Sequence, residues 1–388
     1  MKHCFAEDLA FLQKYTDVVL LKTDPPRAQV AVAPEYQGRV MTSTASGAEG
    51  LSFGWINREV IASRKYQPHM NVFGGEDRFW LGPEGGQYSI YFKPNDPFDL
   101  EHWQVPAVID WGRWQVVSRN DAQVRLRADA NLTNYSGAAF NLRIDRTVRL
   151  ISRETLERML LMQETTDLDI VGYESINTIT NTGDQAWTKD RGLLSIWILG
   201  MYNPSPRATV VIPFESGSEA EKGPIVNDDY FGKIPRDRLV VADRVLFFRA
   251  DGKQRGKIGI PRPRAKDTIG SYDAAHRVLT IVQYSLPPGA ADYVNSMWKI
   301  QAEPYNGDVV NSYNDGPPEK GAKALGGFYE LETSSPAAEL APGEQLNHVH
   351  RTVHVQGPPR SLDEIAVRTL GTSLKRVTSA FASTDIKK

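Results

Sequence analysis

Apolar and polar residues alternate with a period of two along most of the chain. In AFNLRIDRTVRLI (139–151), apolar residues such as Phe140 and Leu142 fall on one parity, and polar residues such as Asn141 and Arg143 fall on the other. Because successive side chains of a strand point to opposite faces, this pattern predicts an antiparallel strand with one buried and one solvated face. The alternation recurs in 17–22, 28–34, 39–45, 87–92, 114–119, 123–133, 173–181, 193–202, 208–214, 244–250, 276–286, 328–335 and 345–357.

Helical spacing of apolar residues is confined to the two ends of the chain. Residues 6–15 predict one short helix, and residues 361–382 predict a longer helix. Ser361 with Glu364 three positions later has the pattern of a capping box, which predicts that the second helix begins there. We expect this helix to pack on the strands that precede it.

The fold class that follows is all-β, a large antiparallel sandwich with a C-terminal helix. The predicted organisation is a helical lead-in over residues 1–15, a β-domain over 16–360 and the C-terminal helix over 361–388. Two long Pro- and Gly-rich segments, 215–238 and 302–327, join strand-like segments. Loops of this length are uncommon in compact domains and often carry function.

Composition narrows the function classes. The 388 residues carry a formal net charge of -2 from nearly balanced acids and bases, which predicts no nucleic-acid surface. No apolar run is long enough for a membrane span, so no membrane partner is expected. The N-terminus is too charged for a secretory signal, which predicts a cytoplasmic protein, or a periplasmic one if a leader has been removed. Cys4 is the only cysteine, which excludes an intramolecular disulfide and a cysteine zinc site.

The stretch NVFGGEDRFWLGPEGG combines two glycine pairs with charged and aromatic residues. Glu76, Asp77 and Arg78 offer the carboxylates and the guanidinium that bind sugar hydroxyls, and Trp80 offers a ring for stacking. The alternative is a local ion pair beside a core tryptophan. Glu84 in the Pro-Glu-Gly turn is either a further hydroxyl acceptor or only a turn residue.

Two other segments carry candidate ligand-binding residues. In FYELET, Glu330 and Glu332 share one strand face, which indicates a raised pKa on one of them or a bound cation; the alternative is a solvated outer face. In NSYNDGPP, Asn311, Asn314 and Asp315 have polar groups suited to sugar hydroxyls, or they simply form turns.

Histidines are the candidates for a general acid. His69, just before the glycine-rich stretch, is the best placed of the seven. His348, His350 and His354 share one parity in NHVHRTVHV, for which we predict an exposed strand face. A His-x-His pair has metal-capable spacing, but no third ligand is evident nearby. We therefore expect no metal and no cofactor.

Four segments together resemble the galactose-mutarotase-like superfamily, which includes the aldose 1-epimerases. They are VAVAPEYQGRVMTSTASG, ESINTITNTGDQAW, ELETSSPAAELAPGEQLNHVHRTVHV and GGEDRFWLGPEGG, the last of which is closest to uncharacterised bacterial branches of the superfamily. The resemblance implies a β-supersandwich with a Glu as general base on the anomeric hydroxyl and a His as general acid at the ring oxygen. By this match the base is Glu332, and Arg78 contacts sugar hydroxyls. The strand expected to carry the His, LLSIWILGMY, has none and presents Trp197 instead.

These observations predict a carbohydrate-binding protein that takes a mono- or oligosaccharide in a groove of the sandwich and is a monomer. If it is an enzyme, it is an epimerase of the mutarotase kind with Glu332 as base and His69 as acid. The alternatives are a non-catalytic glycan-binding protein, a lyase-type activity on the same fold, and a partner-binding protein with a degenerate pocket. Fold alone does not choose between them.

Overall fold

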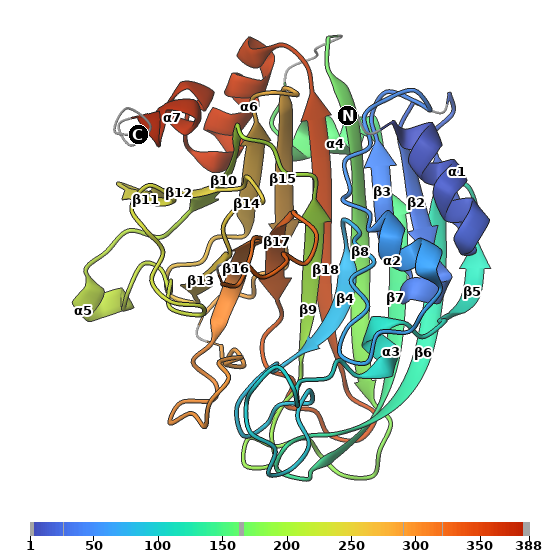
Figure 1. The fold of residues 1–388 in the computed structure, drawn as a ribbon, viewed down its shortest axis with the longest axis vertical. Coiled ribbons are helices and arrows are strands. Elements are labelled where there is room, and N and C mark those ends of the chain that lie inside the picture. Colours follow the sequence, from blue (N-terminus) through green and yellow to red (C-terminus); the bar gives the residue numbers. More distant parts are fainter. Residues whose placement is uncertain (1–3, 26, 163–166, 290, 320, 383–388) are drawn as a thin grey trace.

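Antiparallel sheets are the main regular structure of the molecule, as the computed structural model shows for residues 4–25, 27–162, 167–289, 291–319 and 321–382 (Figure 1). The largest sheet has 10 strands, and long pairings hold it together; β18 and β8, for instance, pair from Gln345↔Thr180 to Gln356↔Asp169. In spatial order its strands are β11 (Leu239–Ala242), β12 (Val245–Arg249), β10 (Ala208–Pro213), β14 (Thr268–Asp273), β15 (Val278–Tyr284), β18 (Gln345–Gln356), β8 (Asp169–Asn181), β7 (Ala139–Leu150), β6 (Gln123–Thr133) and β5 (Gln115–Arg119).

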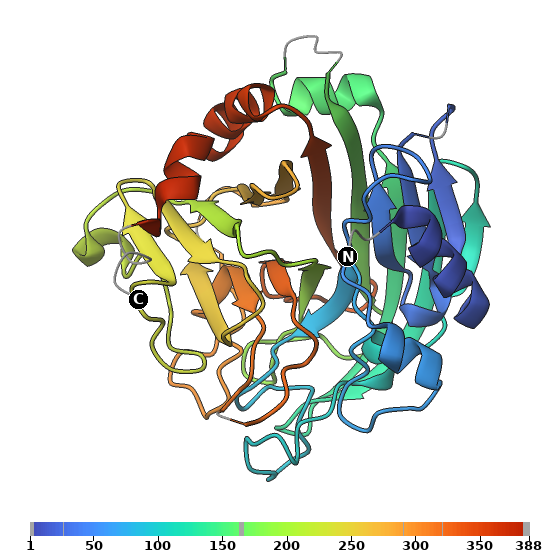
Figure 2. The same ribbon diagram turned by 45° about the horizontal axis from the view of Figure 1, so that its top comes forward.

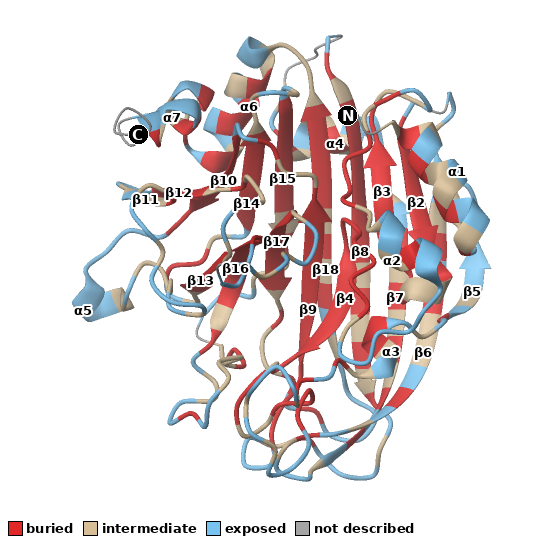
Figure 3. Ribbon diagram, viewed as in Figure 1, coloured by how far each residue is buried: buried red, intermediate tan, exposed pale blue. Residues whose placement is uncertain are grey.

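Two smaller sheets lie against the large one. A five-stranded sheet is ordered β13 (Gly256–Pro261), β16 (Asp308–Asn314), β17 (Tyr329–Ser334), β9 (Ser195–Tyr202) and β4 (Arg78–Gly82). A three-stranded sheet consists of β1 (Val19–Lys22), β2 (Gln29–Ala33) and β3 (Arg39–Thr44). One apolar cluster joins side chains of β1–β4 and β9 to those of β6, β7 and β8, so the small sheets and the large sheet share a core. The central strands are accordingly buried along most of their length (Figure 3).

The structure confirms the predicted all-β class, the antiparallel sandwich and the helical C-terminal segment. That segment is α6 (Pro359–Leu370) and α7 (Leu374–Ser379), which pack over one end of β10, β14 and β15 (Figure 2). The prediction of one continuous helix from Ser361 was wrong. The helix begins at Pro359, which favours the first helical position because it has no N–H to lose. It ends where Gly371 adopts φ 67°, and Ser373 then caps α7. The parts of the predicted terminal elements at 1–3 and 383–388 lie outside the described residues.

Helical turns also occur away from the ends, contrary to the prediction. The N-terminal helix α1 (Phe5–Tyr15) is where it was expected, but short helices sit between strands as well. They are too short for a helical apolar period to stand out in the sequence. These are η1 (Pro34–Tyr36), α2 (Arg58–Ser63), α3 (Ala107–Asp110), α4 (Arg153–Met159) and α5 (Glu219–Lys222).

One strand prediction and two loop predictions also need correction. The strand expected at 87–92 is a series of turns, because Pro83 lacks an N–H with which to continue β4 and Gly86 adopts φ 81°. The segment 302–327, expected to be a loop, contains β16, and 215–238 contains α5. Both faces of β16 are buried, so its sequence has no alternation to reveal it.

The predicted exposed histidine face of β18 is buried. His348 and His350 are both 0 % exposed, because the five-stranded sheet covers this face of the large sheet. Thr333 of β17 reaches both rings, at 2.9 Å from His348 Nε2 and 2.8 Å from His350 Nδ1. Burial lowers the pKa of His348 to about 3 and the pKa of His350 to about 4. Both are therefore neutral core residues at physiological pH.

Candidate functional site

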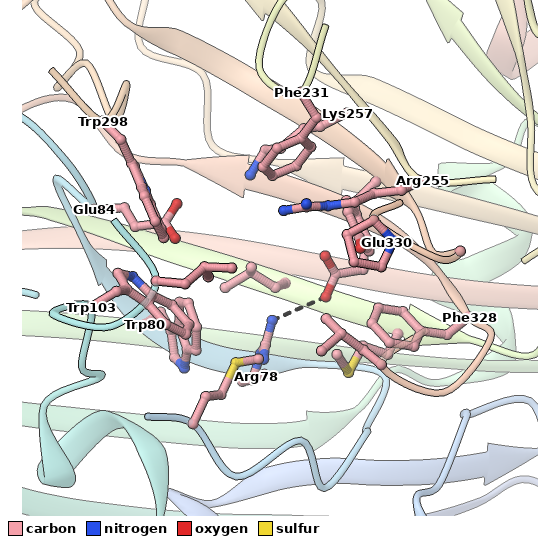
Figure 4. A pocket seen from close by; sticks show the side chains of 18 of the residues that line it. Arg78, Trp80, Glu84, Trp103, Phe231, Arg255, Lys257, Trp298, Phe328 and Glu330 are labelled. Carbon is pink, nitrogen blue, oxygen red and sulfur yellow. Dashed lines mark hydrogen bonds and ion pairs between the residues drawn. The ribbon is translucent and has the colours of Figure 1, made fainter. Parts of the chain in front are cut away.

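A cavity of about 200 Å³ opens over one face of the five-stranded sheet. β4, β9, β13 and β17 contribute to its lining, together with residues of the two long segments, 215–238 and 302–327. Tryptophans stand on one side of it and charged side chains converge on it from the other (Figure 4). A concave site with apolar walls and a few converging polar groups is typical of small-molecule binding.

The floor of the cavity holds an ion pair between two strands. Arg78 of β4 places Nη2 3.0 Å from Oε1 of Glu330 on β17, and the two side chains are 3 % and 7 % exposed. The guanidinium also lies over the Trp80 ring, 4.2 Å from its centre. β9 lies between these two strands, so the pair spans the strand that carries Trp197.

An aromatic wall faces this ion pair. Trp103 and Trp298 are stacked at 5.8 Å between ring centres, and Trp80 lies 6.4 Å from Trp103. Phe231 and Phe328 stand on the opposite side of the cavity (Figure 4). Aromatic faces on two sides and charged groups between them match the two surfaces of a sugar ring, which presents C–H groups on its faces and hydroxyls at its rim.

Glu332 lies behind the cavity and is 0 % exposed. Its Oε2 accepts hydrogen bonds from Trp197 Nε1 at 3.0 Å and from Lys257 Nζ at 3.2 Å. Lys257 and Trp197 line the cavity, whereas Glu332 is not among the lining residues. Burial disfavours the charge of Lys257, but Glu332 and the cavity carboxyls outweigh burial and raise its pKa above the ordinary value.

The two carboxyls that line the cavity have raised pKa values. Burial raises the pKa of Glu84, and this effect outweighs the opposing charge of Lys257. Burial also raises the pKa of Glu330 to about 8, in spite of Arg78, and Glu332 adds to the effect. A carboxyl that titrates near neutrality can both accept and donate a proton, which is what general acid–base catalysis requires.

The structure brings together five of the predicted site residues. Arg78, Trp80, Glu84, Trp197 and Glu330 all line the cavity. Arg78, which the sequence resemblance matched to an arginine that contacts sugar hydroxyls, therefore lies on the cavity floor.

Glu76 and Asp77 lie apart from the cavity. Glu76 occupies a bend before β4, so the alternation of a regular strand does not carry its side chain to the side of Arg78. Its Oε2 accepts from Tyr173 at 3.0 Å and lies 2.9 Å from His354 Nε2. Asp77 pairs with Arg146 at 2.7 Å, both fully buried. These carboxylates hold the sheets together from inside.

The polar residues of β16 and the loop after it serve their own neighbours. Asn311 donates to Tyr230 Oη and to the Ile258 carbonyl, beside a second small polar cavity. Asn314 donates to the Gln254 carbonyl at 2.8 Å. These two asparagines anchor β13 and the residues just before it, which carry the basic residues Lys257 and Arg255 of the site.

Asp315 fixes the segment that closes the cavity. Its Oδ2 accepts the backbone N–H groups of Gly326 and Gly327 at 2.9 and 2.7 Å. Its Oδ1 accepts from Tyr313 at 3.0 Å.

His69, the predicted general acid, is exposed and does not line the cavity. Its Nδ1 lies 2.7 Å from the Trp103 carbonyl oxygen.

Sequence reasoning missed several lining residues: Trp103, Phe231, Arg255, Lys257, Trp298 and Lys323. The signal that could have found Lys257 is a lysine inside GKIGIP, where strand neighbours are apolar and a charge needs a partner. Trp103 and Trp298 lie in irregular segments, and no periodic pattern in the sequence predicts where such segments lie relative to the strands.

Three solved structures are similar to this chain over nearly its whole length. The Slr1438 protein from Synechocystis sp. PCC 6803 matches with a TM-score of 0.51 and 13% identity, over 88% of this chain and 96% of that one. A galactose mutarotase-like protein from Lactobacillus casei has a TM-score of 0.47 and 10% identity, over 88% and 100%. A galactose mutarotase related enzyme from Lactobacillus acidophilus has a TM-score of 0.46 and 8% identity, over 87% and 97%. The likeness to the Slr1438 protein shows that this chain shares its fold.

Within that fold class the chain belongs to a family of unknown function, DUF6786, whose model matches residues 3–381. No curated protein matched the sequence.

Across the described ranges, no three His, Cys, Asp or Glu side chains are grouped so as to hold a metal ion. No helix in the same ranges has the length and apolar character needed to cross a membrane.

Proposed function

We propose that the protein binds a mono- or oligosaccharide in the cavity above Arg78 and Glu330. The observation that carries the proposal is the ion pair on the cavity floor, 3.0 Å long, beneath a wall of three tryptophans. The guanidinium and carboxylate supply donors and acceptors for adjacent hydroxyls, and Trp80, Trp103 and Trp298 supply stacking faces. The resemblance of the sequence to the galactose-mutarotase-like superfamily likewise implies a carbohydrate ligand.

The reaction that this arrangement supports is opening and closing of an aldose ring. One group removes the proton of the anomeric hydroxyl, and the freed electron pair forms the carbonyl. The bond from the anomeric carbon to the ring oxygen breaks, and a second group gives that oxygen a proton. Closure on either face of the carbonyl returns both protons, so that no other reactant is consumed.

Glu330 and Glu84 are our candidates for the two proton-transfer groups. They face the cavity from different sides (Figure 4), and both have raised pKa values. Glu332, the base that the resemblance implies, would act as a positioning residue, because its carboxylate binds Lys257 and Trp197 rather than the open space. His69 remains the alternative acid only if the segment that holds it moves toward the ligand.

Non-catalytic sugar binding is the second candidate. Arg78 donates directly to Oε1 of Glu330, so one oxygen of this carboxyl is already engaged and is not free to take a proton from a ligand. The same residues would then bind hydroxyls without proton transfer.

One experiment tests both candidates. Ligand binding is followed by NMR titration and anomer exchange by NMR saturation transfer, for the wild type, Glu330→Gln and the exposed control Glu339→Gln. We expect Glu330→Gln to lower the exchange rate at least about a hundredfold and the control to leave it unchanged. Binding without any exchange in the wild type would favour the non-catalytic candidate. Absence of binding to every sugar tried would refute the proposal itself.

A further inference from the structure

The charges around the cavity do not balance. Four basic side chains line it: Arg78, Arg255, Lys257 and Lys323. Three carboxyls oppose them, Glu84 and Glu330 in the lining and Glu332 directly behind. Two of the four basic groups are neutralised locally, Arg78 by Glu330 and Lys257 by Glu332. The imbalance grows when burial keeps a proton on Glu84 or Glu330, since a protonated carboxyl carries no charge.

Arg255 and Lys323 are the two lining basic residues without an ion-pair partner in the described chain, and Arg255 is the one whose guanidinium stacks on an aromatic ring. Within the described part of the chain its guanidinium makes no hydrogen bond and no ion pair, and it lies 3.7 Å from the centre of the Phe231 ring. It reaches into the cavity between Lys257 and Glu330 (Figure 4). A guanidinium stacked on an aromatic face keeps its N–H edge available, and that edge fits two oxygens of a carboxylate or phosphate.

The structure holds this arginine in place from both sides. Gly256, directly after Arg255, begins β13 and pairs with Asn314 of β16. Phe231 comes from the long segment 215–238 and supports the guanidinium from the other side. A preorganised cation at the mouth of a partly apolar cavity costs little to order when an anion binds, and it discriminates against neutral ligands.

On the basis of the proposed sugar site, we propose that the natural ligand is an anionic sugar whose carboxylate or phosphate binds Arg255. The sugar ring then lies between the tryptophan wall and the Arg78–Glu330 pair, and its charged substituent points to the Phe231 side. Lys323, exposed in the segment 302–327, adds to the positive potential at the entrance. A neutral aldose would leave the Arg255 charge without a counter-ion in the complex.

The test is isothermal titration calorimetry with matched sugars at pH 7 and low salt. D-glucuronate and D-galacturonate are compared with D-glucose and D-galactose, and D-glucose 6-phosphate is the phosphate arm. We expect one anionic sugar to bind at least about tenfold more tightly than its neutral parent, and high salt to reduce that preference. Preference for the uronates assigns the anion as a carboxylate, and preference for the phosphate assigns it as a phosphate.

Arg255→Gln is the informative variant. It should weaken binding of the preferred anionic sugar roughly ten- to a hundredfold and change binding of the neutral parent less than about twofold. Arg236→Gln removes one positive charge from the exposed part of the segment that carries Phe231, and it should leave both affinities unchanged. Equal binding of neutral and anionic sugars, or an Arg255→Gln variant that keeps the preference, would overturn the inference while the proposed sugar site stands. Failure of every sugar to bind would overturn both.

Discussion

Arg78 and Glu330 lie 252 positions apart in the sequence and meet at 3.0 Å on the floor of the cavity. Neither residue has another charged partner at ion-pair distance in the described chain. Each strand therefore delivers one half of a buried charge pair, and the pair depends on the packing of β4, β9 and β17 in the correct register.

Removing Arg78 should destabilise the protein in a pH-dependent way. The pKa of Glu330 is raised from 4.5 to about 8 by burial, so the folded chain binds this proton more tightly than the unfolded chain does. Its contribution to stability is therefore fully present below pH 4.5 and is lost as the pH rises through 8. Without Arg78 the ionised carboxylate would have no counter-charge. We expect the loss of unfolding free energy in Arg78→Gln to grow between pH 6 and pH 9, to about 3 kcal/mol at the upper end.

Urea denaturation of the wild type and Arg78→Gln at pH 6, 7.5 and 9 measures this difference. The double variant Arg78→Gln/Glu330→Gln is the control, because it has no carboxyl at this position to ionise. Its stability difference from the wild type should change much less with pH than that of the single variant. A destabilisation by Arg78→Gln that is the same at all three pH values would contradict the buried ion pair.

Asp315 should control access to the cavity through the segment it anchors. Asp315→Asn replaces one acceptor oxygen with an NH₂ group, so either the Gly326 and Gly327 N–H bonds or the Tyr313 bond is lost. We expect a loss of about 1–3 kcal/mol in unfolding free energy, the usual cost of leaving such groups unsatisfied. Hydrogen exchange at Gly326 and Gly327 should accelerate, and ligand affinity should fall. Unchanged exchange at these two amides would show that Asp315 does not hold the segment.

The alternation of apolar and polar residues was sufficient to predict the fold class, because the long strands β6 and β7, and parts of β8 and β18, have two faces in different environments. β7 shows the pattern clearly, with alternate residues buried. β16 could not be found in this way, because burial on both faces removes the alternation. The prediction of an exposed histidine face on β18 was wrong for a related reason. A second sheet covers this face, and the local sequence does not show which face of a strand a distant sheet covers.

The candidate site was predictable only in part. Arg78, Trp80 and Glu84 stood out because they lie close together in sequence, and Glu330 because it shares a strand face with Glu332. Arg255 did not, since only the pairing of β13 with β16 brings it to the cavity. Glu76 and Asp77 were also predicted to bind ligand because they precede Arg78 in the sequence. The bend at Glu76 turns these side chains toward the interior of the sandwich instead.

Glu76 should matter for stability and not for sugar binding. Its carboxylate accepts from Ser43 and Tyr173 and contacts His354 inside the sandwich. Glu76→Gln places an NH₂ group among these partners, and we expect a loss of about 3 kcal/mol in unfolding free energy. The dissociation constant for sugar, measured on folded protein by calorimetry, should stay within about twofold. A folded Glu76→Gln protein that has lost binding would instead support the sequence-based prediction that Glu76 contacts ligand.

The buried histidines should make the protein less stable in mild acid. Burial lowers the pKa of His348 to about 3 and that of His350 to about 4, from an ordinary value of 6.5. Below pH 6.5 the unfolded chain binds protons at these positions and the folded chain does not. The stability they contribute is therefore present above pH 6.5 and is lost as the pH falls toward 4, by up to about 1.4 kcal/mol per pH unit for each histidine.

Two histidine variants separate the contribution of these histidines to the pH dependence of stability from the contribution of the carboxyls. His350→Asn can keep a polar group near the Nδ1 position that contacts Thr333, and His348→Gln can keep one near the Nε2 position. Neither replacement titrates, so each variant should lose one histidine's share of the dependence on pH. We expect the slope of unfolding free energy against pH between 4.5 and 6 to differ from the wild-type slope by about 1 kcal/mol per pH unit. Parallel slopes for the wild type and both variants would mean that these histidines take up protons in the folded state, which burial beneath β17 does not allow.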